Sequence, residues 1–324
     1  MRVLVLHSDV APNAPPDEQD TLIAARAIGE ALESRGHRTS LAPFVFDPEA
    51  LREIIAEHRA DAVFNMVEAI FRQGELAPIV PTLLEKLNVP FTGCPSAPMA
   101  LAGDKPLTKT LLRMGGLPTP EWHEAPFEGV SKDIRYIVKS ATEDASIGLD
   151  SAAVVAGEAV RERADLCRHT YGGRWFAEAY VEGREFNISV LEEKGGPRVL
   201  PIPEMLFHNW DENRPRIVGY DAKWTEASPD YNETVRQFRS DAEDPALYKK
   251  LTELSEAAWR LFRLKGFARI DFRVSEAGEP FILEINPNPC LEPGSGFAAA
   301  AEQAGMPYAE IIERVLHVAL NITR

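Results

Sequence analysis

The chain has 324 residues, 45% hydrophobic and 26% charged, which is typical of a globular protein with more than one core. Its net charge of −15 and pI near 5.0 disfavour nucleic acid and anionic membranes as partners, because both are negatively charged. Cys94, Cys167 and Cys290 lie too far apart for a disulfide framework or a zinc motif, which favours a reducing, cytoplasmic location.

The first hundred or so residues alternate between two patterns. Short apolar runs at 3–6, 62–66 and 89–92 predict buried parallel strands, and apolar residues at helical spacing predict helices over 20–35, 48–58 and 76–87. This alternation predicts an open parallel sheet, without the GxGxxG fingerprint of dinucleotide binding. The opening MRVLVLHSD lacks a signal-peptide pattern, and no apolar run approaches the roughly 18 residues of a membrane span.

The middle of the chain mixes helices and strands. A helix is predicted over 104–114, where Gly115 and Gly116 end it, followed by a strand at 136–139. A small polar loop at 140–148 precedes a predicted helix over 151–169. Two further strands, 175–180 and 185–191, flank a turn at Glu182 and Gly183.

The segment 266–289 contains the densest group of charged and amide side chains that could form a functional site. Two alternating runs flank a turn signal at Ala277–Gly278, which predicts a β-hairpin with a two-residue turn. Alternation then places Arg269, Asp271 and Arg273 on one strand face, and Ile282, Glu284 and Asn286 on the facing one. In this register Asp271 lies opposite Glu284 and Arg269 opposite Asn286.

Facing carboxylates repel each other unless a cation lies between them. Carboxylate and amide oxygens are ligands that Mg²⁺ prefers, with water and substrate phosphates completing its octahedron. Asp271, Glu284 and Asn286 therefore predict a magnesium site, and Arg269 a donor for phosphate or a developing oxyanion. A solvated outer face of an ordinary hairpin is the alternative, which the rigid exit at INPNP disfavours.

Three lysines lie in settings that suit phosphate contact. Lys105 opens a helix, Lys139 ends an apolar strand and Lys223 lies among aromatic residues in YDAKW. The loop TEDASIG, residues 142–148, follows Lys139 and can cover phosphates with its backbone amides, although Gly148 is its only glycine. Each lysine taken alone is also compatible with an ordinary surface position.

The order and spacing of these motifs resemble the D-alanine–D-alanine ligase family of the ATP-grasp superfamily, from about residue 61 to the end. The segments that carry the resemblance are VFN, QGEL, LLEKLNVPFTGCPSAPMALAGDKPLTKTLLRMGGLPTP, YIVKSATEDASIGL, FAEAYVEGREFNISVL, IVGYDAKW, FARIDFRV, FILEINPNP and LEPGSGFAAAAEQAGMPY. The resemblance implies an α/β ATP-grasp fold with an open parallel sheet domain followed by two α+β domains that sandwich ATP. The expected domains are 1–96 for substrate, 97–181 as the lid and 182–324 for catalysis.

The resemblance also implies roles for individual residues. Phosphate contacts are expected from Lys105, Lys139, Ser146 and Lys223; adenine contacts from Glu178, Ala179 and Val181; and ribose contacts from Glu185. Two Mg²⁺ ions, or Mn²⁺, are expected on Asp271, Glu284 and Asn286. Arg269 is expected to stabilise the tetrahedral intermediate, Ser295 to contact the second substrate's carboxylate, and Glu18, with Glu68 as an alternative, to hold the first substrate's amine.

Several positions depart from the family pattern. In the phosphate loop, Asp144 replaces a glycine and Ala145 replaces a serine that bonds a tyrosine of the substrate loop. That tyrosine corresponds to Trp224, which cannot accept a hydrogen bond, so the link is expected to be lost or the lid packed differently. Glu292 adds a carboxylate near the acceptor site, which favours a basic or amine-rich acceptor.

The resemblance implies an ATP-dependent ligase that joins a small carboxylate to an amine through an acyl-phosphate, forming a dipeptide or related amide. Its ligands are ATP, Mg²⁺ and amino acid-like substrates, and a homodimer is an open expectation. Two alternatives are an ATP-grasp protein that binds nucleotide in a regulatory role without turnover, and an ATP-grasp phosphotransferase that stops at a phosphorylated product.

Overall fold

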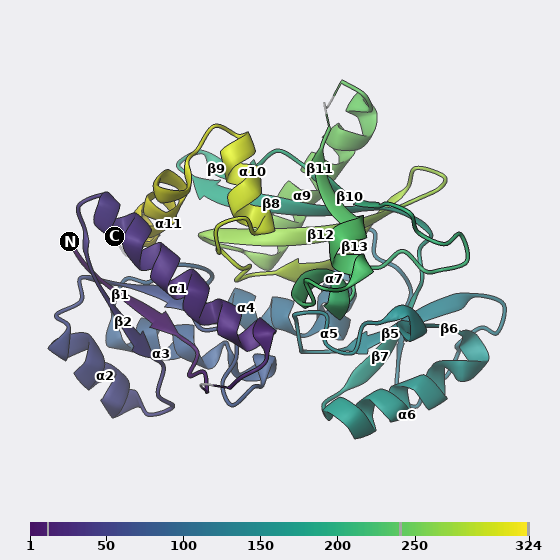
Figure 1. Ribbon diagram of the computed structural model, residues 1–324, viewed down its shortest axis with the longest axis horizontal. Coiled ribbons are helices and arrows are strands. Elements are labelled where there is room, and N and C mark those ends of the chain that lie inside the picture. The colour runs from purple at the N-terminus through teal and green to yellow at the C-terminus, as the bar shows by residue number, and fades with distance from the viewer. Residues whose placement is uncertain (12, 240–241, 323–324) are drawn as a thin grey trace.

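The computed structural model describes residues 1–11, 13–239 and 242–322, which form three β-sheets with helices packed against them (Figure 1). The sheets follow one another along the chain. Within this described part no helix is long and apolar enough to span a membrane.

The first sheet has strand order β2-β1-β3, with both pairings parallel, as the N-terminal pattern predicts. Its strands are β1 (Arg2–His7), β2 (Arg38–Pro43) and β3 (Ala62–Met66), and its helices are α1 (Pro16–Ser34), α2 (Pro48–Glu57) and α3 (Ile79–Leu87). The pattern missed β2, because this edge strand is mostly polar. The predicted strand over 89–92 is wrong, since only one isolated bridge, Val63 to Phe91, forms there.

Two helices, α4 (Ser96–Gly103) and α5 (Lys105–Met114), lead from the first sheet to the second. The side chain of Asp104 accepts a hydrogen bond from the amide of Leu107 and so caps α5. This cap places Lys105 at the first position of the helix, next to the phosphate-loop segment.

The second sheet has strand order β4-β7-β5-β6, formed by β4 (Trp122–Glu124), β5 (Arg135–Ser140), β6 (Val154–Ala156) and β7 (Trp175–Ala179). The helix predicted over 151–169 is only partly correct. Val154 and Val155 form β6 and pair with β5, as β-branched residues favour, and the α-helix α6 begins at Val160 and ends at Tyr171.

The third sheet has the path β11-β10-β8-β12-β13, with β9 paired to β8. Its strands are β8 (Gly183–Glu193), β9 (Gly196–Val199), β10 (Pro203–Phe207), β11 (Thr234–Phe238), β12 (Phe267–Ser275) and β13 (Pro280–Asn286). The long helix α9 (Pro245–Phe262) packs on it through a core with Phe186, Ile270 and Phe272. Two short helices, α7 (Tyr220–Trp224) and α8 (Pro229–Glu233), lie between β10 and β11 along the chain.

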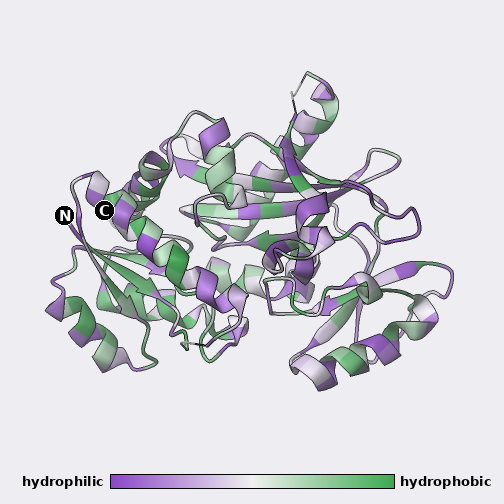
Figure 2. Cartoon of the chain, in the orientation of Figure 1, coloured by the Kyte–Doolittle hydropathy of each residue, from purple (hydrophilic) through white to green (hydrophobic). Residues whose placement is uncertain are grey.

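The C-terminal helices connect the third sheet with the first. α10 (Gly296–Gln303) and α11 (Tyr308–Ile322) share one hydrophobic cluster with β1 and α1, joining Val3, Ile28, Phe267, Phe297 and Ile312. Figure 1 shows α11 beside α1, and Figure 2 shows hydrophobic residues along the strands of the first sheet. The first strand and the last helix thus belong to one core.

Candidate functional site

The β12–β13 hairpin has the predicted register at its inner end. Asp271 pairs with Glu284 and Arg269 with Asn286. The two-residue turn is wrong, however: Ser275 donates to the carbonyl of Glu279, which leaves a three-residue turn with Gly278 at φ 80°. A β-bulge opposite Asp271/Phe272 adds Leu283 to β13 and restores the register at the carboxylates.

The bulge also corrects the predicted face of Ile282. This residue is fully buried in the core with Ile270 and Phe272 rather than beside Glu284. Backbone and side chains from outside the hairpin hold the bulge: the amide of Ile282 donates to Pro118 at 2.9 Å, and Nζ of Lys109 donates to the carbonyl of Leu283 at 3.0 Å. The connection after α5 therefore helps to position Glu284.

Four charged or polar side chains meet on this hairpin. Arg269 binds both oxygens of Asp271 at 2.8 Å, and both side chains are largely buried. Burial alone would raise the pKa of Glu284, but the positive charges of Lys105, Lys139, Arg269 and Lys223 lower it to about 2. Asn286 Oδ1 accepts from the amide of Asn288 at 3.1 Å. The patch thus holds an ionised carboxylate among four cations.

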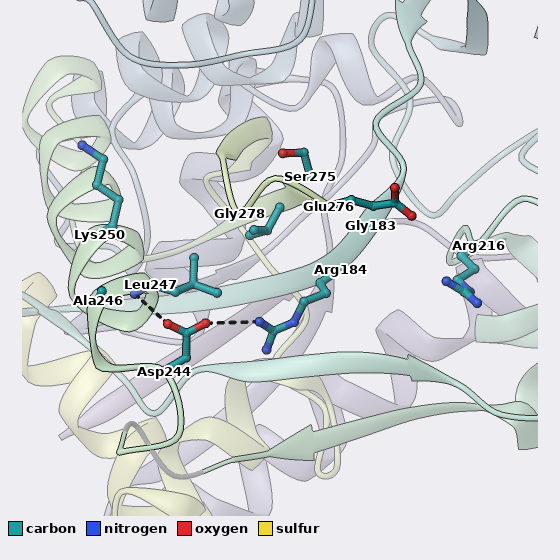
Figure 3. A pocket seen from close by; sticks show the side chains of 11 residues that line it. Gly183, Arg184, Arg216, Asp244, Ala246, Leu247, Lys250, Ser275, Glu276 and Gly278 are labelled. Atoms are coloured by element: carbon teal, nitrogen blue, oxygen red, sulfur yellow. Dashed lines mark hydrogen bonds and ion pairs between the residues drawn. The ribbon is translucent and has the colours of Figure 1, made fainter.

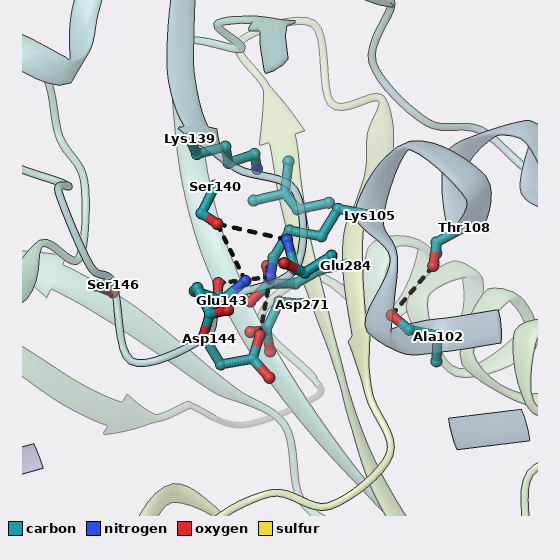
Figure 4. A network of polar contacts seen from close by, with 12 residues as sticks. Ala102, Lys105, Thr108, Lys139, Ser140, Glu143, Asp144, Ser146, Asp271 and Glu284 are labelled. Atoms are coloured by element: carbon teal, nitrogen blue, oxygen red, sulfur yellow. Dashed lines mark hydrogen bonds and ion pairs between the residues drawn. The ribbon is translucent and has the colours of Figure 1, made fainter. Parts of the chain in front are cut away.

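Lys105 connects the hairpin with the phosphate-loop segment (Figure 4). Its buried ammonium donates to Asp144 Oδ1 and to the carbonyl of Glu143, both at 2.9 Å, and lies 3.8 Å from Glu284. Burial disfavours its charge, but Asp144 and Glu284 outweigh burial and raise its pKa. Asp144 stands where the family pattern has a glycine. It thus forms an ion pair with the lysine that is expected to contact phosphate.

Asp144→Asn should lower the KM for ATP about twofold to fivefold, because ATP then no longer displaces a carboxylate from Lys105. Steady-state ADP release at varied ATP measures this, with Asp133→Asn, on the exposed loop before β5, as the matched control. An unchanged or higher KM in Asp144→Asn would show that this ion pair does not compete with nucleotide.

A buried lysine that the sequence interpretation missed lies behind this cluster. Lys109 is fully buried and forms an ion pair with Glu178, whose other oxygen lies 2.7 Å from Nζ of Lys139. Burial lowers the pKa of Lys109 to about 8 despite its carboxylate partner. Its only sequence signal was a lysine on the apolar face of α5, four residues after Lys105. Glu178, expected at the adenine, is thus shared by two lysines.

The remaining predicted nucleotide contacts lie around the junction of β7 and β8. Glu185 is buried 3.4 Å from Arg273, and burial raises its pKa. Ala179 ends β7 and its amide donates to Glu121, while Val181 lies between the two strands. Lys223 comes from α7; burial and the nearby Arg269 lower its pKa, and Glu284, Asp271 and Glu185 act in the opposite direction.

The link between the phosphate loop and the substrate loop is present, in a different form. Trp224 Nε1 donates to the backbone carbonyl of Ala145 at 3.0 Å, so the indole acts as donor and no side-chain acceptor is needed. The family's side-chain link is therefore lost, as expected, and the two loops are joined by a different contact. Ser146, expected at phosphate, donates to the carbonyl of Val218 at 2.9 Å and strengthens the same contact.

Trp224→Phe should lower kcat/KM for ATP about threefold to tenfold with little change in thermal stability, because it removes one hydrogen bond and keeps an aromatic ring. The matched control is Trp210→Phe, which removes a similar indole bond, to the carbonyl of Pro215. Equal kcat/KM in Trp224→Phe and wild type would contradict a role for this bond.

The end of the site near α10 carries the residues expected at the substrates. Ser295 caps α10 by accepting from the amide of Ala298 at 3.4 Å. Arg236, another residue that the sequence interpretation missed, donates to the carbonyl of Gly294 at 3.0 Å; burial and nearby Arg269 lower its pKa. The guanidinium of Arg236 therefore lies beside the segment that carries Ser295.

A group of acidic side chains lies where α1 meets the segment before α10. Cys290 Sγ lies 3.3 Å from Asp20, and the ligand atoms of Asp20, Cys290 and Glu292 lie within 4.8 Å of one another. Burial, and then the charge of Asp20, raise the pKa of Glu292 to about 7. Glu18 pairs instead with the exposed Arg72 at 2.6 Å, while Glu68 lies close enough to Cys290 to affect its pKa.

A separate surface pocket of about 530 Å³ lies by the turn of the β12–β13 hairpin and the start of α9 (Figure 3). Arg184 and Asp244, which form an ion pair, are among its lining residues. None of the predicted site residues lines it, so the candidate site is the charged cluster rather than this pocket.

Comparisons with known proteins point to one family. Residues 113–317 match the family model described as the D-ala D-ala ligase C-terminus. The D-alanine–D-alanine ligase of Aquifex aeolicus is 30% identical, over 98% of this chain and 100% of its own length. An uncharacterized protein, y4sG, of Sinorhizobium fredii is 31% identical, over 79% of this chain and 74% of its own.

The fold is also found in solved structures. The D-alanine–D-alanine ligase of Bacillus anthracis, solved in complex with ATP, superposes with a TM-score of 0.76 at 18% identity, covering 100% of this chain and 98% of that one. The corresponding ligase of Coxiella burnetii gives a TM-score of 0.73 at 19% identity. These similarities confirm the predicted α/β ATP-grasp fold class.

Proposed function

The chain belongs to the D-alanine–D-alanine ligase family, and on this premise we propose that it is an ATP-dependent ligase that joins an amino acid-like carboxylate to an amine. The observation that carries the proposal is the β12–β13 hairpin, where Asp271 and Glu284 face each other among Arg269, Lys105, Lys139 and Lys223. An ionised carboxylate surrounded by cations suits the transfer of a highly charged phosphoryl group.

The reaction proceeds in two steps. An oxygen of the substrate carboxylate attacks the γ-phosphorus of ATP, the bond to the bridging oxygen breaks and ADP leaves, which produces an acyl-phosphate. A neutral amine then attacks the acyl carbon, the C–O bond to phosphate breaks, and the amine's extra proton is released with phosphate. Arg269 stabilises the oxyanion of the tetrahedral intermediate, while the Trp224–Ala145 contact holds the loops that exclude water.

The carboxylates and the amide of the hairpin fit a magnesium site by donor chemistry. Asp271, Glu284 and Asn286 supply the hard oxygens that Mg²⁺ prefers, and Mn²⁺ accepts the same set. When bound, the metal would neutralise phosphate charge during transfer. Asp271 would then exchange part of its contact with Arg269 for the metal, which frees the guanidinium for the reacting groups.

The roles proposed for nucleotide binding rest on the positions of the residues in the charged cluster and on β7 and β8. We assign Lys105, Lys139, Lys223 and Ser146 to the phosphates, Glu178 with the backbone of Ala179 and Val181 to adenine, and Glu185 to the ribose. The position of Lys105 between Asp144 and Glu284, and of Glu178 and Glu185 on β7 and β8, supports these roles. We further propose the domain boundaries 1–96, 97–181 and 182–324, which place one β-sheet in each domain.

At the substrate end we assign Ser295 and Arg236 to the carboxylate of the second amino acid. The first substrate's amine is assigned to an acidic residue near α1; the ion pair of Glu18 with Arg72 leaves Glu68 as a second candidate. Asp20 and Glu292 give this end a negative charge, which supports an acceptor with a basic side chain.

With such an acceptor, kcat/KM should rise about twofold to fivefold as the pH passes through about 7, because Glu292 gains its negative charge there. Glu292→Gln should remove this part of the rise, and an uncharged acceptor should not produce it. The same pH profile for Glu292→Gln and wild type would contradict the assignment.

The function is tested by ADP release with single and paired amino acids, including basic D- and L-forms. A ligase releases ADP only with a suitable pair, and hydroxylamine traps its acyl-phosphate as a hydroxamate. A phosphotransferase that acts on another acceptor gives ADP without hydroxamate, and a nucleotide-binding regulator gives neither. Absence of carboxylate-stimulated ADP release in every pairing would overturn the proposal.

A further inference from the structure

We propose that His37, Glu313 and His317 form a binding site for a zinc-class divalent cation, which joins the end of α1 to α11, separate from the ATP site. Their ligand atoms all lie within 4.8 Å of one another. Two imidazoles and one carboxylate are a donor set that binds Zn²⁺, with a fourth position left for water.

One distance within the cluster matches a small tetrahedral ion. His37 Nε2 lies 3.4 Å from Glu313 Oε1. Two ligands at zinc distances of about 2.0–2.1 Å are separated by about 3.4 Å across a tetrahedral angle. The residues Glu313 and His317 are four apart on α11 and so project from the same face of the helix. The ligand atom of His317 lies within 4.8 Å of the other two, so the proposal requires the exposed His317 side chain to move closer when the ion binds.

The backbone of His37 is held in place by the way α1 ends. Gly36 adopts a left-handed conformation with φ 86°, its amide donates to Glu33, and the amide of His37 donates to Leu32. These bonds form a Schellman motif. The His37 side chain therefore leaves a rigid helix end rather than a loose loop.

Arg35, from the same helix end, orients the carboxylate. Its guanidinium donates twice to Glu313 Oε2, at 2.6 and 2.8 Å, and leaves Oε1 facing His37. Metal-binding carboxylates are commonly held by such a second hydrogen-bond partner. The charge of Arg35 opposes a cation, so affinity depends on both imidazoles.

The His37 ring is held in place by burial. Its side chain is only 9% exposed, and its Nε2 atom is the ring nitrogen that lies near Glu313. A buried ring in a fixed orientation loses little conformational entropy when it binds an ion.

The test is Zn²⁺ binding by isothermal titration calorimetry, with the full chain free of nucleotide and excess Mg²⁺ present to compete at Asp271 and Glu284. Wild type should bind one Zn²⁺ per chain at this site and unfold at a higher temperature when Zn²⁺ is present. His317→Ala should weaken binding at least about tenfold and lose the thermal shift. The exposed His169→Ala, on α6, is the matched control and should behave as wild type.

His317 is exposed, so its replacement should not prevent folding, whereas His37→Ala can disturb the end of α1. Glu313→Gln is a second test variant, and it should also weaken Zn²⁺ binding and lose the thermal shift. No saturable Zn²⁺ binding in wild type, or equal affinity in wild type and His317→Ala, would overturn the proposal. Neither result depends on ligase activity, so this test of the zinc site is independent of the test of the proposed function.

Discussion

Asp271→Asn should lower kcat for ADP release about 10³-fold, equivalent to about 4 kcal/mol of transition-state stabilisation. The amide keeps the size of the side chain but loses the charge that binds Arg269 at two points and faces Glu284. A metal between the strands would lose an anionic ligand. The measurement is steady-state turnover at saturating ATP and amino acids, over a range of Mg²⁺ concentrations.

Two comparisons distinguish a chemical effect from a folding defect. Asp133→Asn, on an exposed loop, should retain wild-type turnover, and Glu284→Gln should lose turnover to a similar extent as Asp271→Asn. The unfolding temperature of each variant shows whether the fold is intact. If folded Asp271→Asn retained more than about a tenth of wild-type kcat, the hairpin would not be the catalytic metal site.

The second large effect is expected on stability. Glu178→Gln should lower the free energy of unfolding by about 3–5 kcal/mol, because it leaves Lys109 and Lys139 buried together without their counter-charge. Lys109→Met should cost less, about 1–2 kcal/mol, since Glu178 keeps its 2.7 Å contact with Lys139. Urea unfolding measures both values.

The double variant Lys109→Met/Glu178→Gln makes this test specific. It should be more stable than Glu178→Gln alone, because one of the two uncompensated lysines has been removed. The exposed Glu128→Gln serves as the surface control. If Lys109→Met were more damaging than Glu178→Gln, the shared carboxylate would not be the central group of this triad.

Lys109 also predicts a dependence on pH. Its pKa of about 8 in the folded state is below the ordinary 10.5, so between these values the unfolded chain binds more protons. Its contribution to stability therefore rises as the pH increases from about 8 towards 10.5. Lys109→Met should lack this increase in urea unfolding across that range.

Much of the charged hairpin could be predicted because its residues are close in the chain. Alternation and one turn signal are sufficient to place Asp271 opposite Glu284, since a hairpin pairs neighbouring segments. The number of turn residues was wrong, yet the register was right at the carboxylates, because the extra turn residue and the bulge at Leu283 compensate each other. The bulge itself is held by Lys109 and Pro118, which are distant in the chain, so no local sequence pattern predicts it.

The departures from the family pattern at Ala145 and Trp224 show the opposite situation. Ala145 and Trp224 together indicated a lost side-chain link, since neither can provide the family's hydrogen bond. The backbone carbonyl of Ala145 accepts the indole proton instead, and backbone acceptors are present at every residue type. Residue identity alone therefore could not decide whether the two loops are connected.

The sequence by itself determined the family, the fold class and the pairing of Asp271 with Glu284, because each is expressed in the order of motifs or in local alternation. Only the tertiary structure decided which distant charges meet: Lys105 with Asp144, Lys109 with Glu178, and His37 with Glu313. These contacts join segments between 39 and 276 residues apart. Their formation depends on how sheets and helices pack, which hydrophobic burial drives without regard to the particular charges that it brings together.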